Sequence, residues 1–175
     1  LRVGASFYYN QTAKNGTKPW RNTGYKFPVT IVTGDLQYKG FNNNLIVRGN
    51  AVYGNLGASG ALTTINNSSS AASGYPNTTV AQNAVSYGGE AGYNIGSFFH
   101  SKAPRIYPFI RYEYYNPMEK TEANTGLLAD KRFQVSAVTA GLNYYALPNL
   151  VIKADYTHRS IGGGKYNDEN LVSVG

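Results

Sequence analysis

The charged side chains in the strand-like segments of this sequence all fall on one face of those segments. Side chains alternate between the two faces of a β-strand with a period of two residues. In Leu150–Arg159, Lys153 and Asp155 therefore share one face with Arg159, whereas Ile152 lies on the other. The ten charged residues that obey this rule are Arg2, Asp35, Lys39, Arg48, Glu90, Arg111, Glu113, Lys153, Asp155 and Arg159. An apolar outer face with a charged inner face reverses the arrangement of a soluble β-protein, and it predicts an all-β, antiparallel transmembrane β-barrel.

The alternating segments divide the chain into eight expected strands. They are Leu1–Asn10, Val29–Gly40, Leu45–Asn55, Val85–Ile95, Ile106–Tyr115, Gln134–Tyr145, Leu150–Arg159 and Leu171–Gly175. The connections alternate between long ones, at 11–28, 56–84, 116–133 and 160–170, and short ones, at 41–44, 96–105 and 146–149. Long loops on one side and short turns on the other are typical of outer-membrane barrels, whose long loops face away from the cell. Since no apolar 3.6-residue period appears, we expect no helix.

The composition fits a membrane barrel and excludes a membrane-spanning helix. Charged residues make up 14% of the chain, well below the roughly 25% of soluble domains. No stretch approaches the roughly 18 consecutive apolar residues that a spanning helix needs. Cysteine is absent, which excludes a disulfide framework, a thiol nucleophile and a thiolate metal site. Because the chain starts and ends within strand patterns, we expect 1–175 to be a single barrel segment that is incomplete at both ends.

The inner face is the candidate functional site. We expect its pore-lining residues to be Arg48, Arg111, Lys153 and Arg159, with Asp35, Glu90, Glu113 and Asp155 as counter-charges. In a closed eight-strand barrel these groups would form a buried network of ion pairs. In a wider barrel they would line water, and the excess of basic groups would favour anions. Inward-facing glycines leave space and favour the wider barrel; they are Gly4, Gly88, Gly92 and Gly141.

Other chemistry has weaker support in the sequence. His158 and Ser160 lie close to Asp155, as a hydrolase would need, but Asp155 falls on the opposite face of the strand. His100 is expected to be a solvated turn residue, and Gly162–Lys165 lacks the spacing of a phosphate-binding loop. The sequence also lacks the clustered histidines or carboxylates of a metal site. We therefore expect no enzymatic activity, cofactor or metal.

The 11–28 loop carries four basic residues and no acid, and it holds Trp20 and Tyr25. Nucleic-acid binding would use such groups, but contact with lipopolysaccharide phosphates or anionic solutes explains them equally well. We therefore expect no nucleic-acid partner.

A family resemblance lies in the second half of the chain. The stretch 141–156, GLNYYALPNLVIKADY, followed by Gly- and Asn-rich residues at 162–170, resembles the closing hairpins of Gram-negative porins. The strand 109–115, FIRYEYY, is similar to the same group, and the likeness is strongest from Tyr87 onward. The pattern resembles the Bacteroidetes-type phosphate-selective porins of the O/P-like family, in their C-terminal part. That resemblance implies a barrel of about 16 strands, although the terminal aromatic residue of the family is missing after Gly175.

These observations predict an outer-membrane porin for passive diffusion of small polar or anionic solutes in a Gram-negative bacterium. The expected partners are the lipid bilayer, lipopolysaccharide and small solutes, with a homotrimer or a membrane protein complex as the assembly. The alternative is a small closed eight-strand barrel that acts as an anchor, an adhesin or a subunit of a membrane complex. A membrane-embedded enzyme is a further and more remote alternative.

Overall fold

The computed structural model describes residues 1–11, 26–70, 79–99, 104–123, 125–147, 149–165 and 167–175. Eight strands account for most of these residues. They are β1 (Arg2–Gln11), β2 (Pro28–Gly40), β3 (Leu45–Leu56), β4 (Asn83–Tyr93), β5 (Arg105–Lys120), β6 (Val135–Leu147), β7 (Leu150–Ile161) and β8 (Asp168–Val174). One α-helix, α1 (Ser59–Ser70), and two short 3₁₀ turns, η2 (Ile95–Phe98) and η3 (Lys131–Phe133), complete the described elements.

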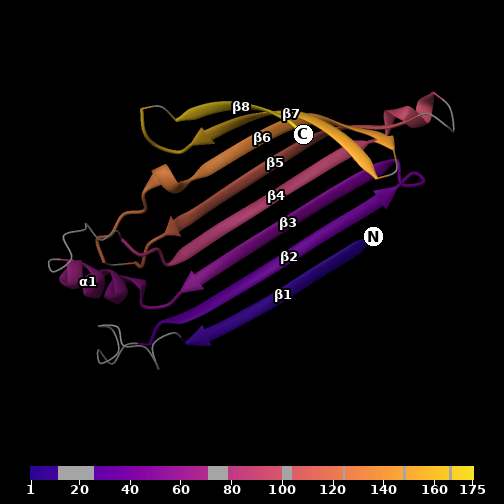
Figure 1. Cartoon of the computed structure of the whole chain (residues 1–175). Helices are drawn as coiled ribbons and strands as arrows, with labels where there is room; N and C mark the ends of the chain where they lie inside the picture. The colour runs from indigo at the N-terminus through magenta and orange to yellow at the C-terminus, as the bar shows by residue number, and fades with distance from the viewer. Residues whose placement is uncertain (12–25, 71–78, 100–103, 124, 148, 166) are drawn as a thin grey trace.

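The eight strands form one antiparallel sheet in which each strand pairs with its neighbours in the sequence (Figure 1). This confirms the expected all-β class and the expected antiparallel order of strands. The sheet is open, and β1 and β8 are its two edges. Figure 1 shows it coiling, so that β7 and β8 turn away from the plane of the preceding strands. A closed eight-strand barrel is therefore not the arrangement seen here.

Long connections lie at one end of the sheet and short turns at the other, as the sequence predicts (Figure 1). A four-residue turn, 41–44, joins β2 to β3. Phe41, Asn42 and Asn43 all have positive φ angles, of 50°, 53° and 66°. Asparagine tolerates the left-handed region better than most residues, whereas an aromatic residue is rare there. The turn closes with a 3.0 Å hydrogen bond from the amide of Asn44 to the carbonyl of Phe41.

The expectation that no helix is present is wrong, because α1 occupies part of the 56–84 connection. Its sequence has few apolar residues, so its periodicity gives no helical signal. The helix depends instead on contacts from another loop. The Gly60 amide donates a 2.5 Å hydrogen bond to the carboxylate of Glu122. A carboxylate satisfies the unpaired amides of the first helical turn and interacts favourably with the helix dipole.

Strand boundaries also differ from the expected ones. The largest differences are in β5, which extends to Lys120 rather than Tyr115, and in β8, which begins at Asp168 rather than Leu171. The added residues include asparagine, proline and acidic residues, which are poor strand formers, so the sequence pattern leaves them outside the predicted strands. The β5 extension contains an irregularity in its pairing with β4, between Asn83 and Val85.

Few large apolar side chains are buried in the described part of the chain. The buried hydrophobic residues are Phe27, Tyr107, Met118, Val135 and Ala137. A sheet normally buries its apolar face against a second layer of structure. Here the apolar face of a single sheet has no such layer among the described residues, and this leaves it available to another apolar medium.

Candidate functional site

The pairing register places all ten strand charges predicted from the sequence on one face of the sheet. Residues directly opposite each other in neighbouring strands point to the same face. Arg48 pairs with Glu90, and Glu90 pairs in turn with Arg111. Each of the other predicted charges either pairs with a residue of this row or lies an even number of residues from one along the same strand. The prediction of a common face is therefore confirmed, and we call this face the polar face.

Further charged residues lie at strand ends that the sequence pattern leaves outside the predicted strands. Arg105 and Glu169 lie on the polar face, because they align with Tyr145 and Arg159. Asp168 lies on the opposite face, where its carboxylate accepts a 2.6 Å hydrogen bond from the hydroxyl of Ser160. Lys120, at the end of β5, pairs with Asn83 and so also lies on the opposite face. The one-face rule therefore holds along the middle of the strands and fails at the ends of β5 and β8 beside the long connections.

The opposite face is apolar and exposed. Phe7 is 69% exposed and Ile110 is 58% exposed. Further large apolar side chains exposed on this face are Val3, Val32, Leu36, Tyr38, Tyr53, Tyr87, Tyr112, Val138, Leu142, Tyr144, Ile152, Tyr156, Val172 and Val174. A continuous exposed apolar surface of this kind marks contact with a partner or with lipid.

An ion-pair cluster occupies the centre of the polar face. Arg111 donates hydrogen bonds of 2.9 and 2.6 Å from Nε and Nη2 to Oε2 of Glu90. Nη1 of Arg48 lies 3.6 Å from the other carboxylate oxygen, Oε1. The Glu90 side chain is 18% exposed, whereas that of Arg48 is 57% exposed. Glu90 therefore holds Arg111, whose side chain is 41% exposed, by two hydrogen bonds, and it contacts Arg48 more loosely.

A hollow of about 340 Å³ lies beside this cluster. Its charged and amide-bearing lining residues are Asp35, Gln37, Arg48, Asn50, Glu90, Arg111 and Glu113. Two guanidinium groups thus face three carboxylates, which gives the hollow a net charge of −1. Within the described residues, neither Asp35 nor Glu113 has a cationic nitrogen within 4.0 Å.

Two adjacent rows of paired residues carry opposite net charge. The row with three basic residues and one acid, which we call the basic row, is Arg2, Gln37, Arg48, Glu90, Arg111, Thr139, Thr157 and Leu171. The next row toward the long connections has three acids and one base. This acidic row is Gly4, Asp35, Asn50, Gly88, Glu113, Ala137, Arg159 and Glu169. Rows two residues apart along a strand are separated by about 6.8 Å.

The remaining predicted site residues lie on the same face but farther along the sheet. Arg159 forms an ion pair with Glu169 across the β7–β8 pair. It also lines a second hollow of about 340 Å³, together with Glu113 and Thr157. Lys153 and Asp155 lie on β7 nearer the short turns and line neither hollow. The structure therefore gathers Asp35, Arg48, Glu90, Arg111 and Glu113, links Arg159 to them, and leaves Lys153 apart. Asp155 lines neither hollow, but it lies close enough to Arg111 to interact with it electrostatically.

Of the four inward glycines that the sequence predicts to leave open space, Gly88 alone lines either of these two hollows. A Cβ atom at Gly88 would lie 3.4 Å from both Oδ1 of Asn50 and Cγ of Glu113. The side chain of Asp35 covers the Cα of Gly4 so closely that a Cβ there would collide with it. Gly141 is likewise covered by Phe109 and Asp155, whose atoms would lie 2.6 and 2.7 Å from an added Cβ. The expectation that these glycines leave open space is therefore wrong for Gly4, Gly92 and Gly141, where neighbouring residues fill the space.

The Ser, His and acid considered for catalysis are not assembled. His158 Nδ1 lies 3.0 Å from Oδ1 of Asn170 on the apolar face. Ser160 bonds to Asp168 on that same face, whereas Asp155 belongs to the polar face. No group of three His, Cys, Asp or Glu side chains that could hold a metal ion occurs among the residues described. His100 and most of the basic 11–28 loop lie outside these residues.

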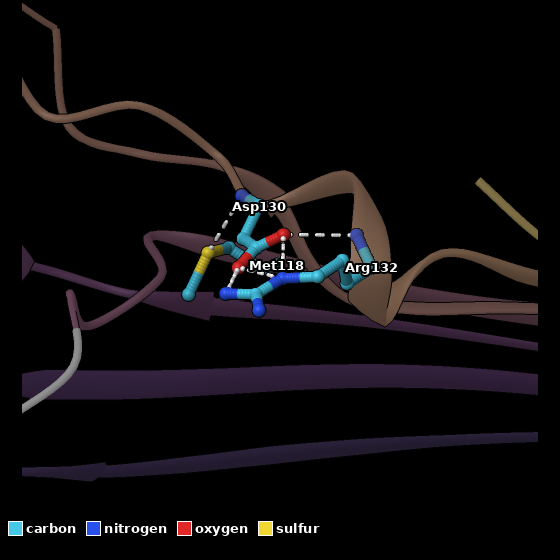
Figure 2. A network of polar contacts seen from close by, with 3 residues as sticks. All are labelled: Met118, Asp130 and Arg132. Carbon is cyan, nitrogen blue, oxygen red and sulfur yellow. Dashed lines mark hydrogen bonds and ion pairs between the residues drawn. The ribbon is translucent and has the colours of Figure 1, made fainter. Parts of the chain in front are cut away.

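A second polar network ties together the β5–β6 connection at the loop end (Figure 2). The Asp130 amide donates a 3.1 Å hydrogen bond to the sulfur of Met118, which is 7% exposed. The Asp130 carboxylate accepts from the Arg132 amide at 2.9 Å and from the Arg132 guanidinium at distances of 2.6 to 3.1 Å. Hydrogen bonds from Arg132 lower the pKa of Asp130 below its ordinary value of 3.8. This network orders a loop and is separate from the polar face.

Neither family models, curated proteins nor solved structures gave a match to this chain. In the part of the chain that the structure describes, no helix combines the length and apolar character needed to cross a bilayer.

Proposed function

We propose that this chain forms part of the wall of a bacterial outer-membrane porin, through which small polar solutes, anions among them, diffuse passively. The observation that carries this proposal is the separation of charge from apolar surface on the two faces of one sheet. An apolar face toward lipid and a polar face toward water is the arrangement of a transmembrane barrel wall. The same surface would be costly in water, because its large aliphatic and aromatic side chains are exposed.

The lengths of the strands support a membrane-spanning sheet. β1, β4 and β7 contain 10, 11 and 12 residues. A tilted strand needs about 9 to 11 residues to cross the hydrocarbon region. The sorting of long and short connections to opposite ends gives the sheet the polarity of an outer-membrane barrel. In that orientation α1 and the network around Asp130 lie on the outer side, where lipopolysaccharide is the neighbouring surface.

The open edges of the sheet favour a wall that is larger than these eight strands. Unpaired backbone groups are not tolerated in hydrocarbon, so β1 and β8 each need a further strand in a bilayer. A barrel with more strands encloses water rather than packed side chains. This agrees with the resemblance to phosphate-selective porins, and it favours a pore over a small closed anchoring barrel.

The proposal is tested by reconstituting the purified protein in planar bilayers. A porin gives stepwise single-channel conductance. Arg111→Glu then shifts the reversal potential in a salt gradient toward cations, because basic groups beside the path attract anions. Lys153→Glu gives a smaller shift, since Lys153 lies apart from the central cluster. Insertion without conductance contradicts the pore and supports the closed anchoring barrel, and conductance that neither variant alters contradicts the assignment of the polar face to the diffusion path.

A further inference from the structure

We propose that the hollow over Gly88 binds dipeptide-sized zwitterions, with the ammonium group at Glu113 and the carboxylate at Arg48. The inference rests on the proposed function, because it names a solute class for the face that would line the pore. Its basis is the change from net basic to net acidic between two neighbouring rows. A solute with one charge of each sign can interact favourably with both rows, whereas a simple anion or cation meets repulsion from one of them.

The cationic half of the site is Arg48. Its side chain is 57% exposed, and its one ion-pair contact within the described residues is the 3.6 Å approach to Oε1 of Glu90. Arg111, by contrast, is held by two short hydrogen bonds to Oε2 of the same carboxylate. Because a guanidinium has five N–H donors, Arg48 keeps free donors for a carboxylate. Its contact with Glu90 also shows that its side chain leans from β3 toward β4.

The anionic half is Glu113. Its Cγ lies 3.4 Å from the position that a Cβ of Gly88 would occupy, so its side chain leans from β5 toward β4. In the described chain, no cationic nitrogen lies within 4.0 Å of its carboxylate. Glu113 and Arg48 therefore both reach over β4, one beside Gly88 and the other beside Glu90. These two positions on β4 are two residues apart, which corresponds to about 6.8 Å.

The spacing and the remaining lining select a dipeptide. Two residues of extended peptide span about 7 Å, which matches the separation of the two rows. Asn50 lines the same hollow, and its Oδ1 lies 3.4 Å from the position that a Cβ of Gly88 would occupy. An amide side chain both donates and accepts hydrogen bonds, so it can pair with the peptide group of the solute. The volume of about 340 Å³ is in the range of small-molecule sites.

The experiment measures binding directly, by titration calorimetry of the full chain in detergent. The three probes are glycylglycine, N-acetylglycylglycine, which lacks the ammonium, and glycylglycinamide, which lacks the carboxylate. We expect glycylglycine to bind about tenfold more tightly than either capped probe, as one charge-assisted hydrogen bond predicts. Glu113→Gln should remove the preference over the N-acetyl probe, and Arg48→Gln should remove the preference over the amide probe.

The matched control is Asp168→Asn, which removes one negative charge on the opposite face of the sheet. This variant should keep both preferences. Equal dissociation constants for the three probes, or no binding of glycylglycine, would overturn the inference. Planar-bilayer conductance of the same preparation separates the two proposals. A conducting protein without the preference refutes the dipeptide site alone, whereas a protein that binds with the preference but does not conduct refutes the pore alone.

Discussion

Arg111 directs two of its N–H groups at a single carboxylate oxygen of Glu90, at 2.9 and 2.6 Å, while Arg48 approaches the other oxygen. One carboxylate thereby serves as the counter-charge for two arginines on flanking strands. Such clusters restrain long side chains at fixed positions and keep them from spreading across the face. Arg48 is the more accessible of the two, at 57% exposed against 41% for Arg111, and it has more N–H donors free for a solute.

Replacing Glu90 with glutamine tests this arrangement. Glu90→Gln removes the counter-charge of both arginines, so the reversal potential of the conducting protein should shift toward the equilibrium potential of chloride. We also expect a loss of about 1 kcal/mol in the free energy of unfolding, since the pair is partly exposed. The measurements are reversal potentials in a salt gradient and urea unfolding from vesicles. Asp168→Asn, with the same change of charge on the apolar face, should leave the reversal potential unchanged, and an equal shift in both variants would contradict the prediction.

The ion pair between Arg159 and Glu169 should stabilise the edge strand β8. The Nε atom of Arg159 is buried and has no hydrogen-bond partner among the described residues, so loss of Glu169 leaves a partly desolvated charge. We expect Glu169→Gln to speed amide hydrogen exchange across β8 several-fold. A double-mutant cycle with Arg159→Gln should give a coupling energy of about 1 kcal/mol or less. Exchange rates in β8 that do not change would show that the pair contributes nothing to this edge.

The sequence predicts the fold class and the polar face because both follow from a period of two residues. Arg48, Glu90 and Arg111 fall on one face whichever register their strands adopt, provided that the parity is kept. The two-residue alternation could not predict that Glu90 lies between the two arginines. That arrangement depends on the register of three strands, which is set by turns and by packing rather than by alternation.

The features that sequence analysis missed lie where local signals are weak. Glu169 precedes the expected start of its strand, so its pairing with Arg159 had no basis in the pattern. The helix α1 has no apolar stripe, and its first turn is capped by Glu122, which lies 62 residues away in the sequence. A long-range cap of this kind leaves no signature near the helix itself, and a Gly- and Ser-rich segment is therefore expected to be a loop.

The cap on α1 gives a third prediction. Glu122→Ala leaves the Gly60 amide without its carboxylate partner, and a lost cap costs about 1 kcal/mol. Since a helix of this length is marginal on its own, we expect hydrogen exchange in residues 59–67 to become about fivefold faster. Glu119→Ala removes a neighbouring carboxylate that bonds to Tyr114 and Asn116 instead, and it should leave α1 unaffected. Equal exchange in the two variants would show that Glu122 does not hold the helix.

The Asp130–Arg132 pair makes the β5–β6 connection sensitive to acid. Hydrogen bonds from Arg132 lower the pKa of Asp130 below 3.8, and the pKa of Arg132 is raised in turn by its bond to Asp130. A carboxyl group whose pKa is lowered by folding stabilises the folded loop above pH 3.8. That stabilisation is lost as the pH falls through the lowered value. Carboxyl NMR titration should give a pKa below 3.8 in the native protein and a return toward 3.8 in Arg132→Gln. Lys131→Gln, which changes the adjacent charge without touching these bonds, should keep the pKa low; if it raised the pKa as much as Arg132→Gln does, general electrostatics and not the hydrogen bonds of Figure 2 would be the cause.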